Sequence, residues 1–172
     1  MRKSGLTIQI AIVAGVINCV AWYVFAKTIG FYEIDVYKYR NYVTLGVLIT
    51  GIFLAVFLAK RKANGFIEFK DTVKTGLLYS IVLAVVLAIF NYIYYAFITP
   101  DTIEFFLSEA KNYMLKYPEK FKAEDIPRYL EGEKGNFSSV KLIPPVLFFG
   151  LLVSLLIGAI LQKKDPNKVS EN

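Results

Sequence analysis

The side chains that could perform chemistry are few in this chain, and they stand far apart. It has no histidine, which excludes a Ser/His catalytic pair, and its single cysteine, Cys19, excludes an internal disulfide. Acidic pairs occur at Glu124 and Asp125 and at Glu131 and Glu133, in a polar segment where a solvated surface explains them. A metal site needs clustered His, Cys or carboxylate ligands. We therefore predict no catalytic residue, no metal site and no cofactor.

Two asparagines are the polar side chains of greatest interest, because each lies well inside a long apolar stretch. Asn18 belongs to the first stretch and Asn91 to the third. An amide surrounded by hydrocarbon needs a hydrogen-bond partner, and it can find one on a neighbouring helix or on a bound substrate. We expect the first and third helices to pack so that the two amides meet each other or a nearby backbone carbonyl, an interaction of about 0.6–2 kcal/mol.

Four long uncharged stretches must position these side chains, and their length indicates a membrane protein. They cover about 6–26, 42–59, 75–98 and 142–161, and with their connections they form one membrane domain, 1–172. As a helix, the third stretch is roughly 36 Å long, more than the ~30 Å hydrocarbon core of a bilayer. The sequence therefore predicts an all-α integral membrane protein with four transmembrane helices in an antiparallel bundle.

Small residues recur every four positions along the third and fourth stretches. In lipid, where apolar surface alone does not drive association, such stripes let helices approach closely and pack. A partner or a second copy could use the same faces. Together with the two asparagines, the stripe residues form the predicted helix-packing set: Gly76, Ser80, Ala84, Ala88, Gly150, Ser154 and Gly158.

Aromatic and basic residues gather near the ends of the stretches, as is typical of the headgroup layer. We expect 27–41 to lie along the membrane surface, with its tyrosines as anchors or as a binding surface. The link after 60–62 should form a short interfacial helix, whose lysines could alternatively bind a partner or a lipid phosphate. The predicted contacts with lipid or a partner are Trp22, Tyr23, Phe66, Phe69, Lys70, Lys74, Tyr94, Tyr95, Phe106 and Tyr113.

The connection 99–141 is the one segment between stretches that is large enough to offer partner-specific surface. Thr99 as a cap followed by Pro100 predicts a helix start, and apolar residues at a 3.6-residue period then predict an amphipathic helix to Tyr117. This extracytoplasmic helix should lie in the interface or cover the mouth of the bundle. A short helix at about 123–130 should be followed by a loop through Gly132, Gly135 and Asn136.

Basic residues predict the orientation of the bundle. With both termini and the link 60–74 in the cytoplasm, ten Lys and Arg residues fall within about 31 residues, whereas the other ten spread over about 58 on the far side. We therefore expect a multi-pass protein of the bacterial cytoplasmic membrane with both termini inside. The formal net charge of +6 is explained by such loop charge, so nucleic acid is not an expected partner.

Several short motifs carry a resemblance to a known family. The segments FIEFK at 66–70, KTG at 74–76, YIYY at 92–95 and ITPD at 98–101 are similar to those of the small four-span bacterial inner-membrane proteins catalogued as domain of unknown function 4199. The resemblance covers nearly the whole chain, although the family pattern has Asn where Thr99 stands. It implies the four-span fold and residence in the membrane, and it assigns no activity to any residue.

Three classes of function agree with these observations. The first is a non-enzymatic accessory or scaffold protein, which docks a membrane protein partner or a second copy through its small-residue faces and the 99–141 connection. The second is a component that binds or transfers a membrane lipid or a polyprenyl phosphate. The third is a small channel or exporter, which is disfavoured because such proteins commonly carry an acid within the membrane.

Overall fold

The computed structural model describes residues 2–30 and 34–163, and the fold of these residues is helical. Outside the helices, Ile67 and Lys163 form an isolated antiparallel bridge through two backbone hydrogen bonds. In chain order, the elements are α1 (Arg2–Ile29), α2 (Ile34–Lys62), α3 (Phe69–Ile93), the π-helical turn η1 (Tyr94–Ile98), α4 (Asp101–Lys116), the 3₁₀ turn η2 (Ala123–Asp125), α5 (Ile126–Asn136), the 3₁₀ turn η3 (Ser139–Leu142) and α6 (Ile143–Leu161).

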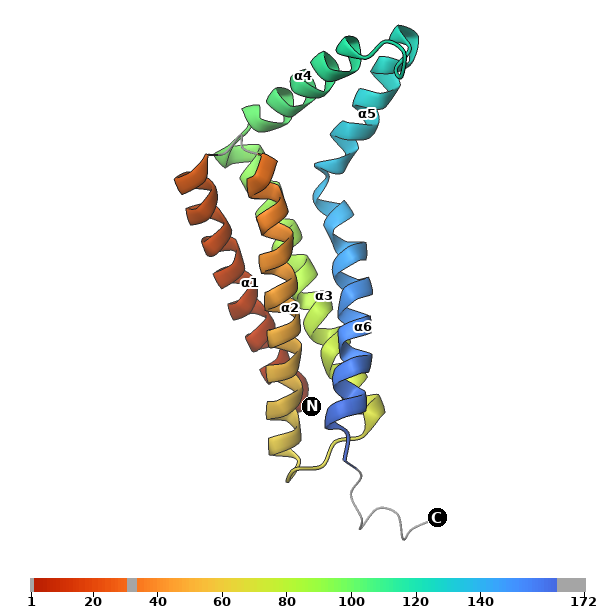
Figure 1. Ribbon diagram of the computed structural model, residues 1–172. Helices are drawn as coiled ribbons and strands as arrows, with labels where there is room; N and C mark the ends of the chain where they lie inside the picture. The colour runs from red at the N-terminus through yellow and green to blue at the C-terminus, as the bar shows by residue number, and fades with distance from the viewer. Residues whose placement is uncertain (1, 31–33, 164–172) are drawn as a thin grey trace.

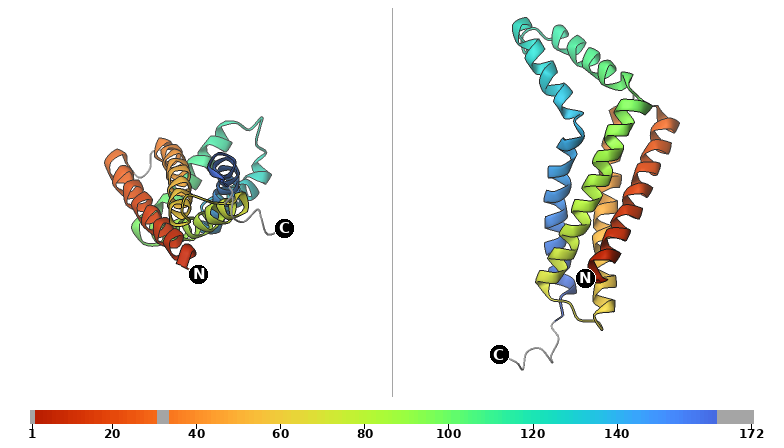
Figure 2. Two further views of the ribbon diagram at one scale, coloured as in Figure 1. Left: turned by 90° about the horizontal axis from the view of Figure 1, so that it is seen from below. Right: turned by 180° about the vertical axis from the view of Figure 1, so that it is seen from behind.

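Four long helices lie side by side as a bundle, with α3 packed against α1, α2 and α6 (Figure 1). The view along the bundle in Figure 2 shows all four helices in cross-section. Each contains a stretch long and apolar enough to cross a membrane, namely Ser4–Ile29, Tyr39–Lys62, Phe69–Ile98 and Ser139–Leu161. These stretches confirm the predicted all-α fold with four transmembrane helices. Large apolar side chains cover their outer faces, as hydrocarbon requires.

The helices α3 and α6 meet along a narrow seam of glycine and serine. A Cβ atom built on Gly76 would overlap the hydroxyl of Ser154, and one built on Gly150 would overlap the hydroxyl of Ser80. Each serine donates a hydrogen bond to the glycine carbonyl four residues earlier on its own helix, at 2.8 Å for Ser80 and 2.5 Å for Ser154. Each side chain is thereby satisfied within its helix, and the seam depends on close contact rather than on hydrogen bonds between helices.

The other helices are joined to the seam by specific polar contacts. The Tyr79 hydroxyl of α3 donates to the Val47 carbonyl of α2 at 3.1 Å, in space left by Gly51. At the end of the bundle that carries the 60–68 connection, here called the link end, the Lys60 ammonium donates to the Leu161 carbonyl at 2.8 Å. A cation at the C-terminus of α6 complements the helix dipole, so this contact holds α2 against α6 at the link end.

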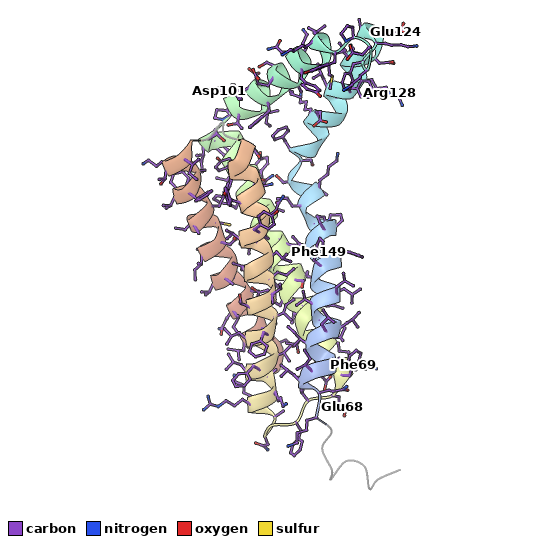
Figure 3. The ribbon with its side chains drawn as sticks, in the orientation of Figure 1. Glu68, Phe69, Asp101, Glu124, Arg128 and Phe149 are labelled. Atoms are coloured by element: carbon purple, nitrogen blue, oxygen red, sulfur yellow. The ribbon has the colours of Figure 1, made fainter. Side chains whose placement is uncertain are left out.

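The opposite end of the bundle carries the arm, which consists of α4, η2 and α5. Figures 1 and 2 show α4 sloping away from the end of α3, while α5 returns to α6 and continues its direction. The side chains of Glu124 and Arg128 lie at the tip of the arm, and those of Glu68 and Phe69 lie at the link end (Figure 3). The predicted helix from Pro100 therefore exists, and it rises from the bundle at a slope rather than lying across its mouth.

Several predicted boundaries were wrong for identifiable reasons. The described part of 27–41 is mostly helical, because α1 continues to Ile29 and α2 begins at Ile34. Thr99 does not cap α4; its backbone N–H donates to the Tyr94 carbonyl at 2.8 Å and closes the π-helical turn, and its hydroxyl donates to the same carbonyl at 3.4 Å. The glycines of 132–136 do not form a loop, since α5 continues to Asn136. A glycine within a helix is only about 1 kcal/mol less favourable than an alanine, so Gly132 and Gly135 do not prevent α5 from continuing through them.

Candidate functional site

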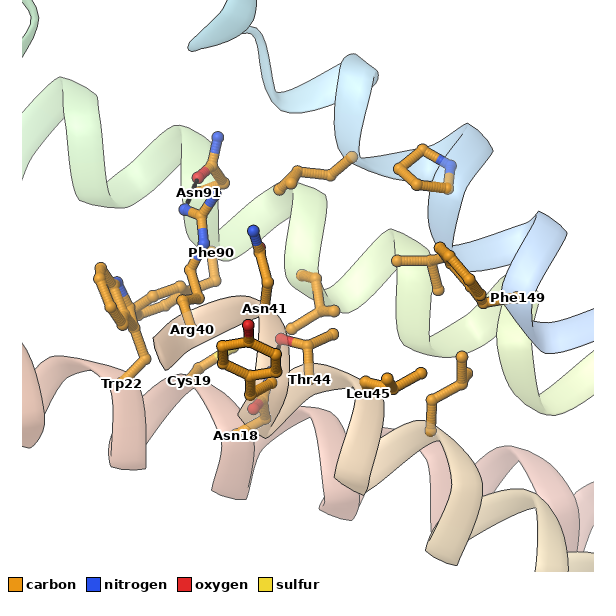
Figure 4. Close-up of a pocket in the computed structure, with 16 residues that line it drawn as sticks. Asn18, Cys19, Trp22, Arg40, Asn41, Thr44, Leu45, Phe90, Asn91 and Phe149 are labelled. Atoms are coloured by element: carbon orange, nitrogen blue, oxygen red, sulfur yellow. Dashed lines mark hydrogen bonds between the residues drawn. The ribbon is translucent and has the colours of Figure 1, made fainter. Parts of the chain in front are cut away.

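A pocket of about 380 Å³ opens between the four long helices in the half of the bundle nearest the arm. Its volume lies within the range of about 300–1,000 Å³ that is usual for small-molecule sites. Residues at helical spacing bring side chains from each helix to its wall, and the close-up in Figure 4 shows them converging. The polar members are Asn18 from α1, Arg40, Asn41 and Thr44 from α2, and Asn91 from α3.

Arg40 supplies the positive charge of the pocket, and two contacts hold its guanidinium in place. One N–H donates to the side-chain oxygen of Asn91 at 3.2 Å, as the dashed line in Figure 4 shows. The guanidinium carbon also lies 5.4 Å from the ring centroid of Trp22, within the range of a cation–π interaction. Among the lining residues that the structure describes, neither Asp nor Glu occurs. The described part of the wall is therefore cationic.

The two buried asparagines both reach this pocket, but they do not bond to each other. Asn18 is 3 % exposed and donates to the Thr44 hydroxyl at 3.2 Å, which joins α1 to α2. Asn91 is 5 % exposed and donates to the Phe137 carbonyl at 3.5 Å and the Ser139 hydroxyl at 3.4 Å. The expected packing of α1 on α3 is present. The two amides do not meet each other; Asn91 instead takes the alternative of a nearby backbone carbonyl, that of Phe137, and Asn18 finds a hydroxyl on α2.

Apolar side chains line the deeper part of the pocket and its opening. Leu48 and Leu87 form buried parts of the wall, and Val146 is its buried member on α6. Tyr42 of α2 and Phe149 of α6 also line the pocket, and both are exposed. Figure 1 shows α2 and α6 side by side, with α3 visible between them. The opening between them therefore faces the surroundings of the bundle, which for a membrane-embedded stretch are lipid chains.

The predicted helix-packing residues lie mainly inside the protein. Those of the α3 and α6 stripes, Gly76, Ser80, Ala84, Gly150, Ser154 and Gly158, are buried, and Ala88 is half-buried. The stripes of α3 and α6 face each other along the seam, so they cannot receive a partner while α6 is in place. Gly158 in turn accepts the ring of Phe69, whose atoms lie 3.0 Å from a Cβ built there.

The predicted lipid or partner contacts fall into two groups. Trp22, Tyr94 and Tyr95 are buried in an aromatic cluster with Phe137 and do not face the surroundings of the bundle, although Trp22 lines the pocket. Their rings cover one another where the arm meets the bundle. The others have at least partly accessible side chains: Tyr23, Phe66 and Phe106 are half-buried, whereas Phe69, Lys70, Lys74 and Tyr113 are exposed.

A second pocket of about 450 Å³ lies at the link end, and its charges are mixed. Lys74 and Lys163 line it together with Glu68 and Asp71. Lys70, which the sequence suggested as a phosphate ligand, is not among the lining residues. Because the carboxylates offset the lysines, this pocket is less suited to an anion than the pocket around Arg40. Within the described residues, no three Cys, Asp or Glu residues gather in a way that could hold a metal ion.

Arg40 is the site residue that the sequence analysis did not identify. It stood in a predicted surface loop, because a charged residue just before an apolar stretch ordinarily marks the end of a span. The early start of α2 brings it into the helix, one turn before Thr44 and on the same face. The sequence did contain one signal for this site. Arg40, Thr44 and Leu48 are spaced by four, so on a helix they form one face that runs from a cation through a polar residue to an apolar residue.

The fold and the pocket define a class: a helical multi-pass membrane protein with a lateral pocket at one end of a four-helix bundle. Comparison with known proteins places the chain more narrowly. The model of a family described as "Protein of unknown function (DUF4199)" matches 10–163, which is most of the chain, and the protein belongs to this family. Neither the curated proteins nor the solved structures include a match to the chain.

Proposed function

We propose that this protein is a non-catalytic membrane protein that binds a lipid-like amphiphile in the pocket between α2 and α6. The observation that carries the proposal is a cavity of about 380 Å³ with apolar walls, polar groups at one end and a lateral opening within the membrane-spanning part of the bundle. Ligand sites commonly combine apolar walls with a few convergent polar groups. A long apolar chain could enter through the opening without crossing water.

The scaffold hypothesis receives less support from the packing of the helices. The small-residue faces of α3 and α6 are buried against each other, so docking of a membrane protein partner or a second copy would have to use the arm or other faces of the bundle. The channel or exporter hypothesis gains no support from the pocket, since none of the lining residues described by the structure is an acid that could couple transport to protons.

The setting that accompanies this proposal is the cytoplasmic membrane of a bacterium, with both termini inside and the arm outside. The basic residues at the link end support this orientation, because short cytoplasmic connections are enriched in Lys and Arg. The pocket, which lies toward the arm, would then open into the outer leaflet.

Native mass spectrometry of the purified protein tests the proposal. We expect one lipid-sized adduct per chain after mild delipidation. Val146→Phe should reduce the adduct severalfold, because a larger ring fills the pocket from its buried wall. Leu152→Phe is the matched control, since Leu152 lies on the exposed face of α6 outside the pocket. Equal adducts in both variants, or none in the unaltered protein, would refute the proposal, and a stoichiometric protein partner in native membranes would favour a scaffold.

A further inference from the structure

The pocket is built in layers that match the layers of a phospholipid. Arg40 is the second residue of the apolar stretch that begins at Tyr39, so its charge stands at the arm end of the span. Leu48, on the same face of α2, lies about 12 Å deeper at 1.5 Å per residue. The pocket therefore reaches through most of one leaflet, which is about half of the ~30 Å hydrocarbon core. A headgroup beside Arg40 would leave an acyl chain beside the leucines.

The polar groups at the headgroup level select for negative charge. The guanidinium is a fork of N–H donors that suits phosphate oxygens, and it keeps its proton in any environment. Its contacts with Asn91 and Trp22 hold it in position before a ligand arrives. Within the described part of the lining, no carboxylate is present to bind a choline or ethanolamine cation. A zwitterionic headgroup would thus find a partner for its phosphate alone.

We infer that the ligand of this pocket is an anionic phospholipid, whose phosphate contacts the Arg40 guanidinium and whose chain lies along Leu48 and Val146 toward the opening beside Phe149. The inference rests on the proposed function, because it names the class of amphiphile that the pocket binds. A cavity of about 380 Å³ encloses the phosphate region and part of one chain. The remaining chain leaves between α2 and α6 into the bilayer.

The chain carries its own probe for this site, since Trp22 is its single tryptophan and lines the pocket. Trp22 is 5 % exposed, so lipids in the bulk bilayer reach it poorly, whereas a brominated chain in the pocket would quench its fluorescence. The protein is reconstituted in phosphatidylcholine bilayers. Brominated phosphatidylglycerol or brominated phosphatidylcholine with identical chains is then added at increasing mole fractions. We expect phosphatidylglycerol to reach half-maximal quenching at about a tenfold lower mole fraction.

Three variants assign the preference to one charge. Arg40→Gln should abolish the difference between the two lipids, and Arg40→Lys should retain most of it because the charge stays. Arg61→Gln removes the same charge at the link end, on an exposed residue outside the pocket, and should behave as the unaltered protein does. If Arg40→Gln fails to fold, the comparison of lipids on the unaltered protein together with Arg40→Lys still decides the question.

The outcomes separate this inference from the proposed function. Equal, saturable quenching by both lipids would overturn the preference for an anion while leaving an amphiphile site in the pocket. Quenching that never exceeds the bulk level, with either lipid, would overturn both. Displacement of brominated phosphatidylglycerol by millimolar inorganic phosphate would overturn the lipid assignment in favour of a soluble anion. A preference that persists in Arg40→Gln would refute the role of Arg40.

Discussion

Replacing Gly76 with alanine should destabilise the protein by forcing α3 and α6 apart. A Cβ built on Gly76 lies 2.7 Å from the Cβ of Ser154 and 3.0 Å from Cγ2 of Ile52. Rotation of the serine side chain would move its hydroxyl but not its Cβ, so the two backbones must separate. Carbon atoms pack best at about 3.5–4.0 Å, which requires a separation of at least about 0.8 Å along the seam.

The expected magnitude follows from this displacement. A gap of about 0.5–1 Å forfeits a quarter to a half of the dispersion energy of the atoms that line it, and overpacked interiors lose about 1–3 kcal/mol. The clash at Gly76 involves Cβ atoms that cannot rotate away, which places it in the upper part of that range. Alanine recovers about 1 kcal/mol through its better helix propensity. The net loss in the free energy of unfolding should be about 1–2 kcal/mol.

Unfolding in mixed micelles measures this loss, with the mole fraction of dodecyl sulfate as the variable and Trp22 fluorescence as the signal. Combining Gly76→Ala with Ser154→Gly should restore much of the stability, because the second change removes the atoms in conflict. The resulting coupling energy should be about 1 kcal/mol or more. Gly46→Ala is the matched control, since a Cβ built on Gly46 meets nothing within 4 Å. Equal midpoints for Gly76→Ala and Gly46→Ala, or no recovery in the double variant, would refute the seam.

Two further predictions concern the polar contacts and the orientation. Tyr79→Phe should lower the free energy of unfolding by about 0.6–1.7 kcal/mol, because it removes the hydrogen bond to the Val47 carbonyl, while Tyr42→Phe on the exposed face should be neutral in the same titration. In a Cys19→Ala background, Ser108→Cys on the arm should react with a membrane-impermeant maleimide in intact cells; reaction only after permeabilisation would reverse the proposed orientation.

The features that the sequence predicted best are those that follow from composition. Four uncharged stretches predicted four spans, because hydrocarbon excludes charged residues over the whole length of a helix. The spacing of Gly76, Ser80, Gly150 and Ser154 also predicted close packing, which the seam confirms. What the sequence could not predict was which helix would cover each stripe, since a stripe is equally suited to a neighbour in the same chain and to a partner.

The pocket was harder to predict because it depends on how the helices are rotated and spaced relative to one another. Periodicity places Arg40 and Asn91 on their own helices, but it does not relate the rotation of one helix to that of another. The amides of Asn18 and Asn91 were recognised as buried polar groups, and a backbone carbonyl was among the partners expected for them, but for the same reason the sequence could not say which segment would supply each partner. Thr44 and Ser139 are common polar residues near the predicted ends of their apolar stretches, so nothing in the sequence singles them out as hydrogen-bond partners.

The tight seam and the pocket follow from a single gradient in side-chain size. Toward the link end, α3 and α6 meet through residues such as Gly76 and Ser154, which permit close approach. Toward the arm, α3 and α6 carry larger residues such as Leu87 and Val146, which line the pocket, while Lys60 joins α2 to α6 at the link end. A ligand can therefore occupy the pocket without separating the seam. Stability at the seam and binding at the pocket should respond to different substitutions, which makes their tests independent.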